Sequence, residues 1–153
     1  MKKILLIATL VGLTYACSNN SSEKKETSST DQASSDDSGS SPEGVGKFKH
    51  IDLAATLDKK LADGGKTIYD MKCAGCHKLT GEKLVGPGWK NVTERRKPEW
   101  IMNFVTNTEE MLNKDTSAQA MLEICMVKMP NQNLSDEDAR KVLEFMREND
   151  GVK

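Results

Sequence analysis

The sequence predicts an all-α fold. Apolar residues recur at helical spacing through 57–76 and again through 139–146, and no stretch shows the two-residue alternation of a strand. At 153 residues the chain has the length of one domain, and its formal net charge of -1 gives no argument for binding nucleic acid. Only 5% of the residues are aromatic, so the core of this domain needs another large apolar body.

The first 16 residues have the features of a secretory signal peptide. Lysines follow the initiator, and residues 4–16 are almost all apolar and end in a small residue. The run is too short for a good transmembrane span. The Ala16–Cys17 boundary is similar to the lipobox of bacterial lipoproteins, which implies cleavage before Cys17 and lipid attachment there. Thr14 stands where such boxes usually have an aliphatic residue, so secretion with a free Cys17 is the alternative.

Residues 17–46 are predicted to form a lipidated cysteine and a disordered tether. The tract is rich in Ser, Asp and Glu and almost lacks apolar side chains, so it cannot bury a core. As a flexible coil it would reach roughly 30 Å. With lipid on Cys17, it would hold the folded domain, residues 47–153, in the periplasm at the surface of the outer or the cytoplasmic membrane.

The central motif of the folded domain is Cys73-Ala-Gly-Cys76-His77, which has the C-x-x-C-H spacing of covalent haem attachment. Its two thiols can form thioethers with the two vinyl groups of one haem, and His77 then lies below the iron as a ligand. A structural zinc site needs about four ligands, and the other cysteines and histidine form no second pair. A thioredoxin-type motif needs a βαβ context, whereas the flanks here have helical spacing.

The elements around the motif follow from local signals. A helix is expected over 58–77, although Gly64 and Gly65 weaken it by about 1 kcal/mol each. Close approach of another helix would explain Gly65, and a break at the glycine pair is the alternative. Residues 79–97 are predicted to be irregular, because Gly86-Pro87-Gly88 is turn chemistry.

The second half of the domain is predicted to hold further helices. Pro98 opens one that runs through Val105, and residues 109–112 form a short helical turn. After a polar loop at 129–133, acids in the first turn favour a last helix from 135 to about 149. Between these, a helix from 116 or 117 to about 126 is expected to turn four residues inward: Ala120, Met121, Ile124 and Cys125.

The iron needs a sixth ligand, and methionine is the expected type. The other histidine, His50, precedes the first helix, where a surface position is expected. Most of the eight methionines fall on apolar helix faces and are expected to pack in the core. Met129 instead stands in a loop before a proline, which makes it the expected ligand, with Met126 as its competitor. A thioether ligand raises the potential relative to a second histidine.

A set of residues occurs in a characteristic order along the chain: Gly65, Tyr69, C-x-x-C-H, Gly86-Pro87, Met129-Pro130 and the closing helix after Leu134. With this set, residues 57–150 resemble class I, monohaem bacterial cytochrome c. Segment 92–103 is similar to a lipoprotein subgroup of these cytochromes. The resemblance implies an all-α fold wrapped around one covalent haem c.

The resemblance also implies roles for single residues. The Pro87 carbonyl would accept a hydrogen bond from the second ring nitrogen of His77, and Met129 would be the distal iron ligand. Gly65 would lie where the first helix crosses the last, against Phe145.

Charge and a few further side chains complete the prediction. By resemblance, Trp100 or else Arg95 and Arg96 would contact the haem propionates, with core packing and solvated charge as the alternative roles. Segment 72–98 holds seven basic and two acidic residues, which predicts a basic rim that steers docking to acidic partners. Cys125 falls on an apolar helix face and is expected to be a buried, inert thiol.

The predicted function is a monomeric one-electron carrier with a His/Met-ligated haem, and not an enzyme. Its expected partners are a quinol-oxidising complex, a terminal oxidase or a periplasmic reductase. A haem peroxidase is one alternative, but it needs a distal acid–base residue that His50 is poorly placed to supply. A gas-binding haem sensor, in which the gas displaces Met129, is the other.

Overall fold

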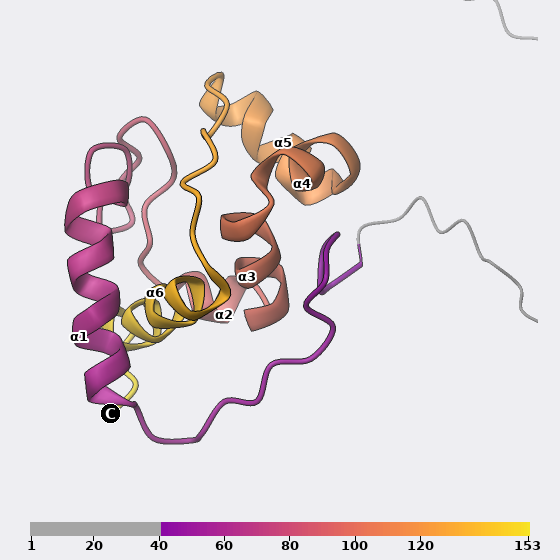
Figure 1. Cartoon of the computed structure of the whole chain (residues 1–153). Helices are drawn as coiled ribbons and strands as arrows, with labels where there is room; N and C mark the ends of the chain where they lie inside the picture. The colour runs from indigo at the N-terminus through magenta and orange to yellow at the C-terminus, as the bar shows by residue number, and fades with distance from the viewer. Residues whose placement is uncertain (1–40) are drawn as a thin grey trace, which may run out of the picture. The chain divides into compact units, whose positions relative to one another are not determined.

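The computed structural model describes residues 41–153, and Figure 1 shows them as helices joined by irregular segments. The all-α prediction is confirmed: in this part of the chain the structure has no strand, and His77 and Lys83 form an isolated bridge. The predicted signal peptide, Cys17 and tether residues 18–40 lie outside the described residues. Between 41 and 153, no helix is both long and apolar enough to cross a membrane.

Six α-helices and one π-helical turn make up the regular structure of residues 41–153. In chain order they are α1 (Lys59–Ile68), the π-helical turn η1 (Tyr69–Cys73), α2 (Val92–Arg95), α3 (Pro98–Thr106), α4 (Thr108–Lys114), α5 (Thr116–Cys125) and α6 (Asp136–Asn149). The predicted starts of α3, α5 and α6 are each within a residue or so of the observed ones, because proline or a capping side chain marks them.

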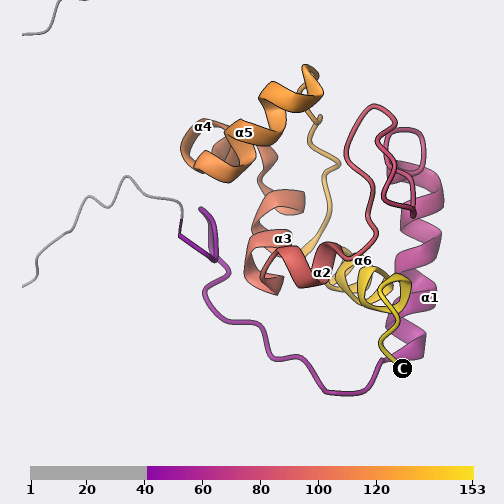
Figure 2. The ribbon, with the colours of Figure 1, turned by 180° about the vertical axis from the view of Figure 1, so that it is seen from behind.

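The crossing of α1 and α6 forms one side of the core (Figures 1 and 2). The glycine pair does not break α1, which continues to Ile68. Gly65 lies directly on α6: a Cβ there would collide with the Lys141 carbonyl oxygen and would lie 2.8 Å from the Phe145 Cβ. The expected close approach at Gly65 is therefore present.

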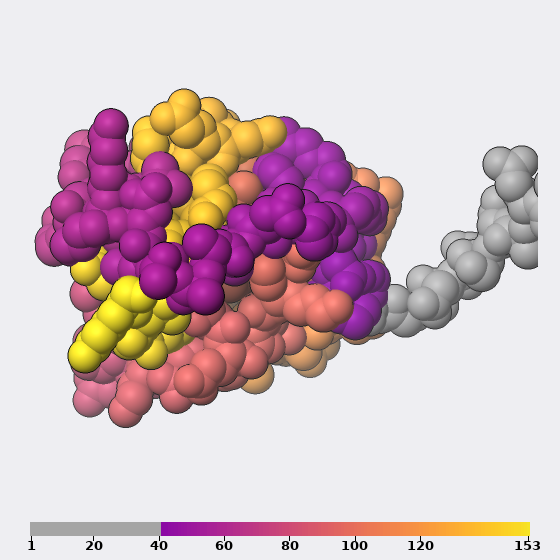
Figure 3. Space-filling model, turned by 90° about the horizontal axis from the view of Figure 1, so that it is seen from below, coloured from indigo at the N-terminus to yellow at the C-terminus, as the bar shows by residue number. Residues whose placement is uncertain are grey.

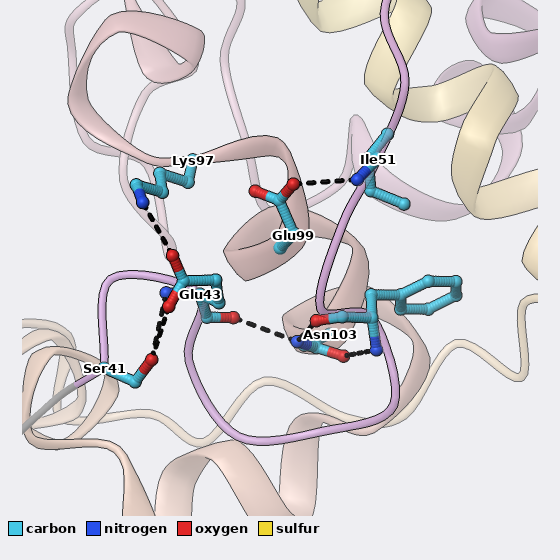
Figure 4. A network of polar contacts seen from close by, with 7 residues as sticks. Ser41, Glu43, Ile51, Lys97, Glu99 and Asn103 are labelled. Atoms are coloured by element: carbon cyan, nitrogen blue, oxygen red, sulfur yellow. Dashed lines mark hydrogen bonds and ion pairs between the residues drawn. The ribbon is translucent and has the colours of Figure 1, made fainter.

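The tether is predicted to extend to residue 46, but residues 41–46 already pack on the helices. We call residues 41–57 the strap, and Figure 3 shows it running across one face of the molecule. The fully buried amide of Asn103 in α3 donates to the Glu43 and Phe48 carbonyls at 2.9 and 3.0 Å and accepts from the Phe48 N–H at 3.0 Å (Figure 4). Composition missed this contact because Asn103 bonds to backbone groups of the strap and not to its side chains.

Lowering the pH should release the start of the strap. Hydrogen bonds from Lys97 and then Ser41 lower the pKa of Glu43 from 4.5 to about 2. Since this pKa is lower in the folded chain, the pair stabilises the fold above about pH 4.5, and that contribution is lost as the pH falls toward 2. Hydrogen-exchange protection of the Phe48 amide, corrected for intrinsic rates, should fall in this window.

Glu43→Gln provides the comparison for this acid release. In that variant the Phe48 amide should be poorly protected already at neutral pH and should change little on acidification. The buried Ala62 amide in α1, which donates to the Asp58 carbonyl at 2.9 Å, reports general unfolding. If Phe48 and Ala62 lose protection together in both proteins, the ion pair does not hold the strap.

The inward face of α5 is rotated from the predicted one. Ala120 and Ile124 are exposed, Ile124 to 68%, whereas Ala118 is fully buried and Leu122 is partly buried. The buried carboxylate of Asp115 caps α5 at the Ala118 N–H and also accepts from the indole of Trp100, at 2.8 and 3.2 Å. This double contact fixes the rotation, and a hydrophobic pattern does not reveal it.

Candidate functional site

The attachment motif begins in η1 and turns back on itself. The backbone N–H groups of Cys76 and His77 both donate to the Cys73 carbonyl, at 3.0 and 2.9 Å. Cys73 is buried and Cys76 is exposed, and neither forms a disulfide. Before the thioether forms, burial raises the pKa of the Cys73 thiol to about 11. The tight turn thus brings both cysteines and the histidine into one short segment.

His77 is held from two sides. The Tyr69 hydroxyl donates to the His77 carbonyl at 2.7 Å, and the imidazole Nδ1 lies 2.9 Å from the Pro87 carbonyl oxygen. Because a carbonyl only accepts, Nδ1 carries the proton and Nε2 keeps its lone pair. The Pro87 contact has the geometry that the resemblance implied, and it leaves Nε2 available as an iron ligand.

The loop after the motif fits closely around the imidazole. A Cβ at Gly86 would collide with the His77 ring, so only glycine allows the backbone to pass there. The Gly86 N–H donates to the Cys76 carbonyl at 2.9 Å, and the Trp89 ring lies 5.8 Å from the imidazole. The turn chemistry at 86–88 therefore serves to orient His77.

Two adjacent cavities meet at His77. The Cys76 cavity has a volume of about 100 Å³ and the Trp100 cavity about 280 Å³. Both are lined mainly by apolar side chains. The residues common to both are His77, Pro87, Phe104, Met121 and Met129. Together the two cavities form one apolar space, called the slot below, that is lined by His77, the Met129 thioether and Cys76. These donors and this lining are what a c-type haem requires.

The charged side chains of the Trp100 cavity are Arg95 and Arg96. In haem, the propionates leave the ring on the side away from the vinyl groups. Since Cys76 lines the other cavity, the arginine side of the slot is where the propionates would lie. Arg95 also donates to the Gly88 carbonyl at 3.1 Å, and the Arg96 guanidinium lies 4.6 Å above the Trp100 ring. Both residues fit the propionate role.

Trp100 fits that role less well than the arginines. Its side chain lines the cavity and is only 5% exposed, but its indole N–H donates to the Asp115 carboxylate at 3.2 Å. Its polar group is therefore committed to the protein. The structure favours core packing, the alternative role, and Trp100 contributes apolar wall.

The candidate methionine ligands differ in whether they line the cavities. Met126 is 83% exposed and lines neither cavity, while Met129 is partly buried and lines both. Met121, on α5, also lines both cavities, and the sequence had placed it among core residues. Met129 comes from an irregular segment, whereas Met121 is part of a helix and packs against the core. The geometry fits Met129 as the ligand better than Met126.

The remaining candidates lie as follows. His50 is exposed, pairs with Asp52 at 2.8 Å and lines neither cavity, as expected for a surface residue. Cys125 is only partly buried and lines the Cys76 cavity, so it is not the enclosed thiol that the sequence predicted. Within residues 41–153, no group of three or more His, Cys, Asp or Glu side chains is arranged to hold a metal ion.

Asp150 is a site residue that sequence reasoning missed. Its carboxylate accepts from the Asn91 N–H at 2.6 Å, and from the Thr93 N–H and hydroxyl at 2.9 and 2.7 Å. It thereby caps α2, whose four residues carry Arg95 and adjoin Arg96. The partners are almost 60 positions apart in sequence, so no local pattern could show the contact.

The comparisons with known proteins agree with this site. The cytochrome c family model matches residues 62–150. Cytochrome c from Rhodothermus marinus has a similar structure, with a TM-score of 0.66, 31% identity, and coverage of 69% of this chain and 90% of that one. An engineered cytochrome c from Rhodothermus marinus, Rma TDE, matches with a TM-score of 0.68 and 30% sequence identity. That match covers 72% of this chain and 98% of the engineered one. No curated protein matches the chain.

The family match spans more than half of the chain and includes both cysteines, His77 and Met129. The alignments with the two structures cover 90% and 98% of the length of the matched chains. This chain belongs to the cytochrome c family as a class I, monohaem member with a covalently bound c-type haem, and it is a haem electron carrier.

Proposed function

We propose that His77 and Met129 ligate the haem iron and that the protein carries single electrons between redox partners. The observation that carries this proposal is that both side chains line the same pair of cavities, from segments far apart in the sequence. The bound haem supplies the Fe(III)/Fe(II) couple. The Pro87 carbonyl fixes the imidazole, and the Met129 loop closes the other side, so neither ligand has to move on electron transfer.

A redox titration of the holo-protein with ligand-binding assays tests this function. We expect a single reversible one-electron wave, no carbon monoxide complex in the reduced protein and negligible turnover of peroxide. A carbon monoxide complex that forms readily would favour the gas sensor. Rapid peroxide turnover with a five-coordinate ferric spectrum would favour the peroxidase.

We further propose that the partner docks at the mouth of the Cys76 cavity. Exposed apolar side chains gather in the segments that line it: Leu84, Val85, Ile124, Met126 and Val127. Of the seven predicted basic residues, Lys97 and Lys78 form ion pairs with Glu43 and Glu82, at 2.6 and 2.8 Å. The positive field is thus weaker than the count suggests, but Lys72 and Lys83 remain unpaired with acids among residues 41–153.

Electron transfer to an acidic partner should slow as salt is added. Because Lys72 and Lys83 are not paired with acids, we expect the bimolecular rate constant to fall by roughly tenfold between 10 mM and 200 mM salt. Stopped-flow measurement with the isolated oxidase or reductase checks this. A rate constant that does not depend on ionic strength would exclude electrostatic steering.

We propose that lipid on Cys17 anchors the protein to a membrane in the cell envelope. The support is the sequence alone: a signal peptide followed by a lipobox-like Cys17. Labelled fatty acid should be incorporated into the wild-type chain and not into Cys17→Ser. Incorporation that persists in the variant would contradict the anchor.

A further inference from the structure

The loop that carries Met129 is weakly held by its own backbone. Residues 126–134 connect α5 to α6 and have no regular structure. Its first N–H, that of Met126, closes α5 on the Leu122 carbonyl, and the Asn133 N–H bonds to the nearby Asn131 side chain. Within residues 41–153, no backbone hydrogen bond ties this loop to another segment. Side chains hold the loop instead: Leu134 is buried in the core at its end, and Lys128 lies 3.9 Å from the Glu109 carboxylate of α4. Bonds from other segments add to these contacts.

Two lysines from the segment around the attachment motif form hydrogen bonds with the Met129 loop and with the end of α5. The Lys72 ammonium donates to the Gln132 carbonyl at 3.0 Å, and the Lys83 ammonium donates to the Ile124 carbonyl at 2.9 Å. Gln132 lies three residues after Met129, and Ile124 lies in the last turn of α5. Both bonds therefore join the His77 side of the cavity to the Met129 side.

The backbone of each lysine is joined to a residue of the haem attachment motif. Lys72 immediately precedes Cys73, and the backbone of Lys83 forms a bridge with that of His77. The Ile124 carbonyl belongs to the last turn of a helix, where carbonyls lack helical partners and a positive charge is favoured. Each bond is charge-assisted, which makes it stronger than a hydrogen bond between neutral groups.

We propose that Lys72 and Lys83 are positioning residues that hold the Met129 loop closed against the attachment segment and so limit the access of external ligands to the iron. This inference rests on the proposed ligation by Met129. The Lys72 bond acts on the loop itself, three residues after Met129, and the Lys83 bond acts on the last turn of α5, from which the loop starts. Each therefore opposes an outward movement of the segment that carries Met129.

The test replaces each lysine with methionine in the full holo-protein and measures how fast imidazole binds to the ferric form. We expect Lys72→Met and Lys83→Met each to raise this rate about fivefold, and the double variant about twentyfold. Lys→Arg at either position, which keeps the charge and the donor, should return the rate to within about twofold of the wild type.

Lys78→Met is the matched control, because Lys78 lies in the same segment but pairs locally with Glu82 at 2.8 Å. It removes the same charge and should leave the rate unchanged. An equal acceleration in this control would reduce the effect to general electrostatics and overturn the proposal. So would unchanged rates in both Lys72→Met and Lys83→Met.

Limited proteolysis separates this proposal from the ligand assignment. Proteinase K should cleave within 127–134 several-fold faster in Lys72→Met than in the wild type or in Lys78→Met, whatever group binds the iron. If the wild-type protein lacks a methionine-to-iron charge-transfer band, ligation by Met129 fails, and the cleavage rates still decide whether the lysines hold the loop. Cleavage at the same rate in all three proteins overturns the proposal.

Discussion

Replacing Gly65 with alanine should destabilise the domain by at least about 3 kcal/mol, because the new methyl group would collide with the Lys141 carbonyl of α6. A backbone oxygen cannot rotate away as a side chain can, so α1 and α6 would have to separate. The separation would loosen the packing of Phe145, which contacts the Tyr69 ring. Thermal unfolding should show the melting temperature lowered by more than about 10 °C.

Gly64 provides a control one position away in the same helix. A Cβ there would lie 3.2 Å from the Lys141 Cδ, part of a flexible side chain that can shift. Gly64→Ala should gain up to about 1 kcal/mol of helix propensity and leave the melting temperature level or slightly higher. If both variants lose stability equally, the helix crossing is not the reason for Gly65.

The sequence predicts the features of this fold that depend on local chemistry. Pro98 and the acids at 136–138 mark helix starts. Helical spacing left a close approach at Gly65 and a break there as alternatives, and the family resemblance implied the contact with the last helix. The rotation of α5 could not be predicted, because Asp115 fixes it through contacts outside the helix pattern. The Asn103 amide bonds to backbone groups of Glu43 and Phe48 in the strap, and composition does not encode such contacts.

The candidate site divides in the same way. Cys73, Cys76 and His77 form one short motif whose spacing is itself the chemistry, so the sequence identifies them directly. The Asp150 cap and the lysine bonds join segments 41 to 60 residues apart, and only the folded chain shows them. The role of Trp100 was undecided between packing and propionate contact, and its bond to Asp115 favours packing.

Met129→Leu should remove the sixth iron ligand and lower the midpoint potential by on the order of 0.1 V, within the roughly 0.8 V over which axial ligands set haem potentials. Leucine has nearly the volume of methionine, so the change removes the sulfur without opening a large cavity. The methionine-to-iron charge-transfer band should disappear, and carbon monoxide should bind the reduced variant. A spectroelectrochemical titration measures the potential and the band together.

Two other methionines make this test specific. Met126→Leu changes a side chain that is 83% exposed and lines neither cavity, so potential and band should stay as in the wild type. Met121→Leu changes one that lines both cavities but sits on α5. That variant should keep the band, with a potential shift well below that of Met129→Leu, because it alters the apolar wall and not the coordination. A band lost only in Met121→Leu would move the sixth ligand from the loop to the helix and leave the lysine contacts without a ligand to position.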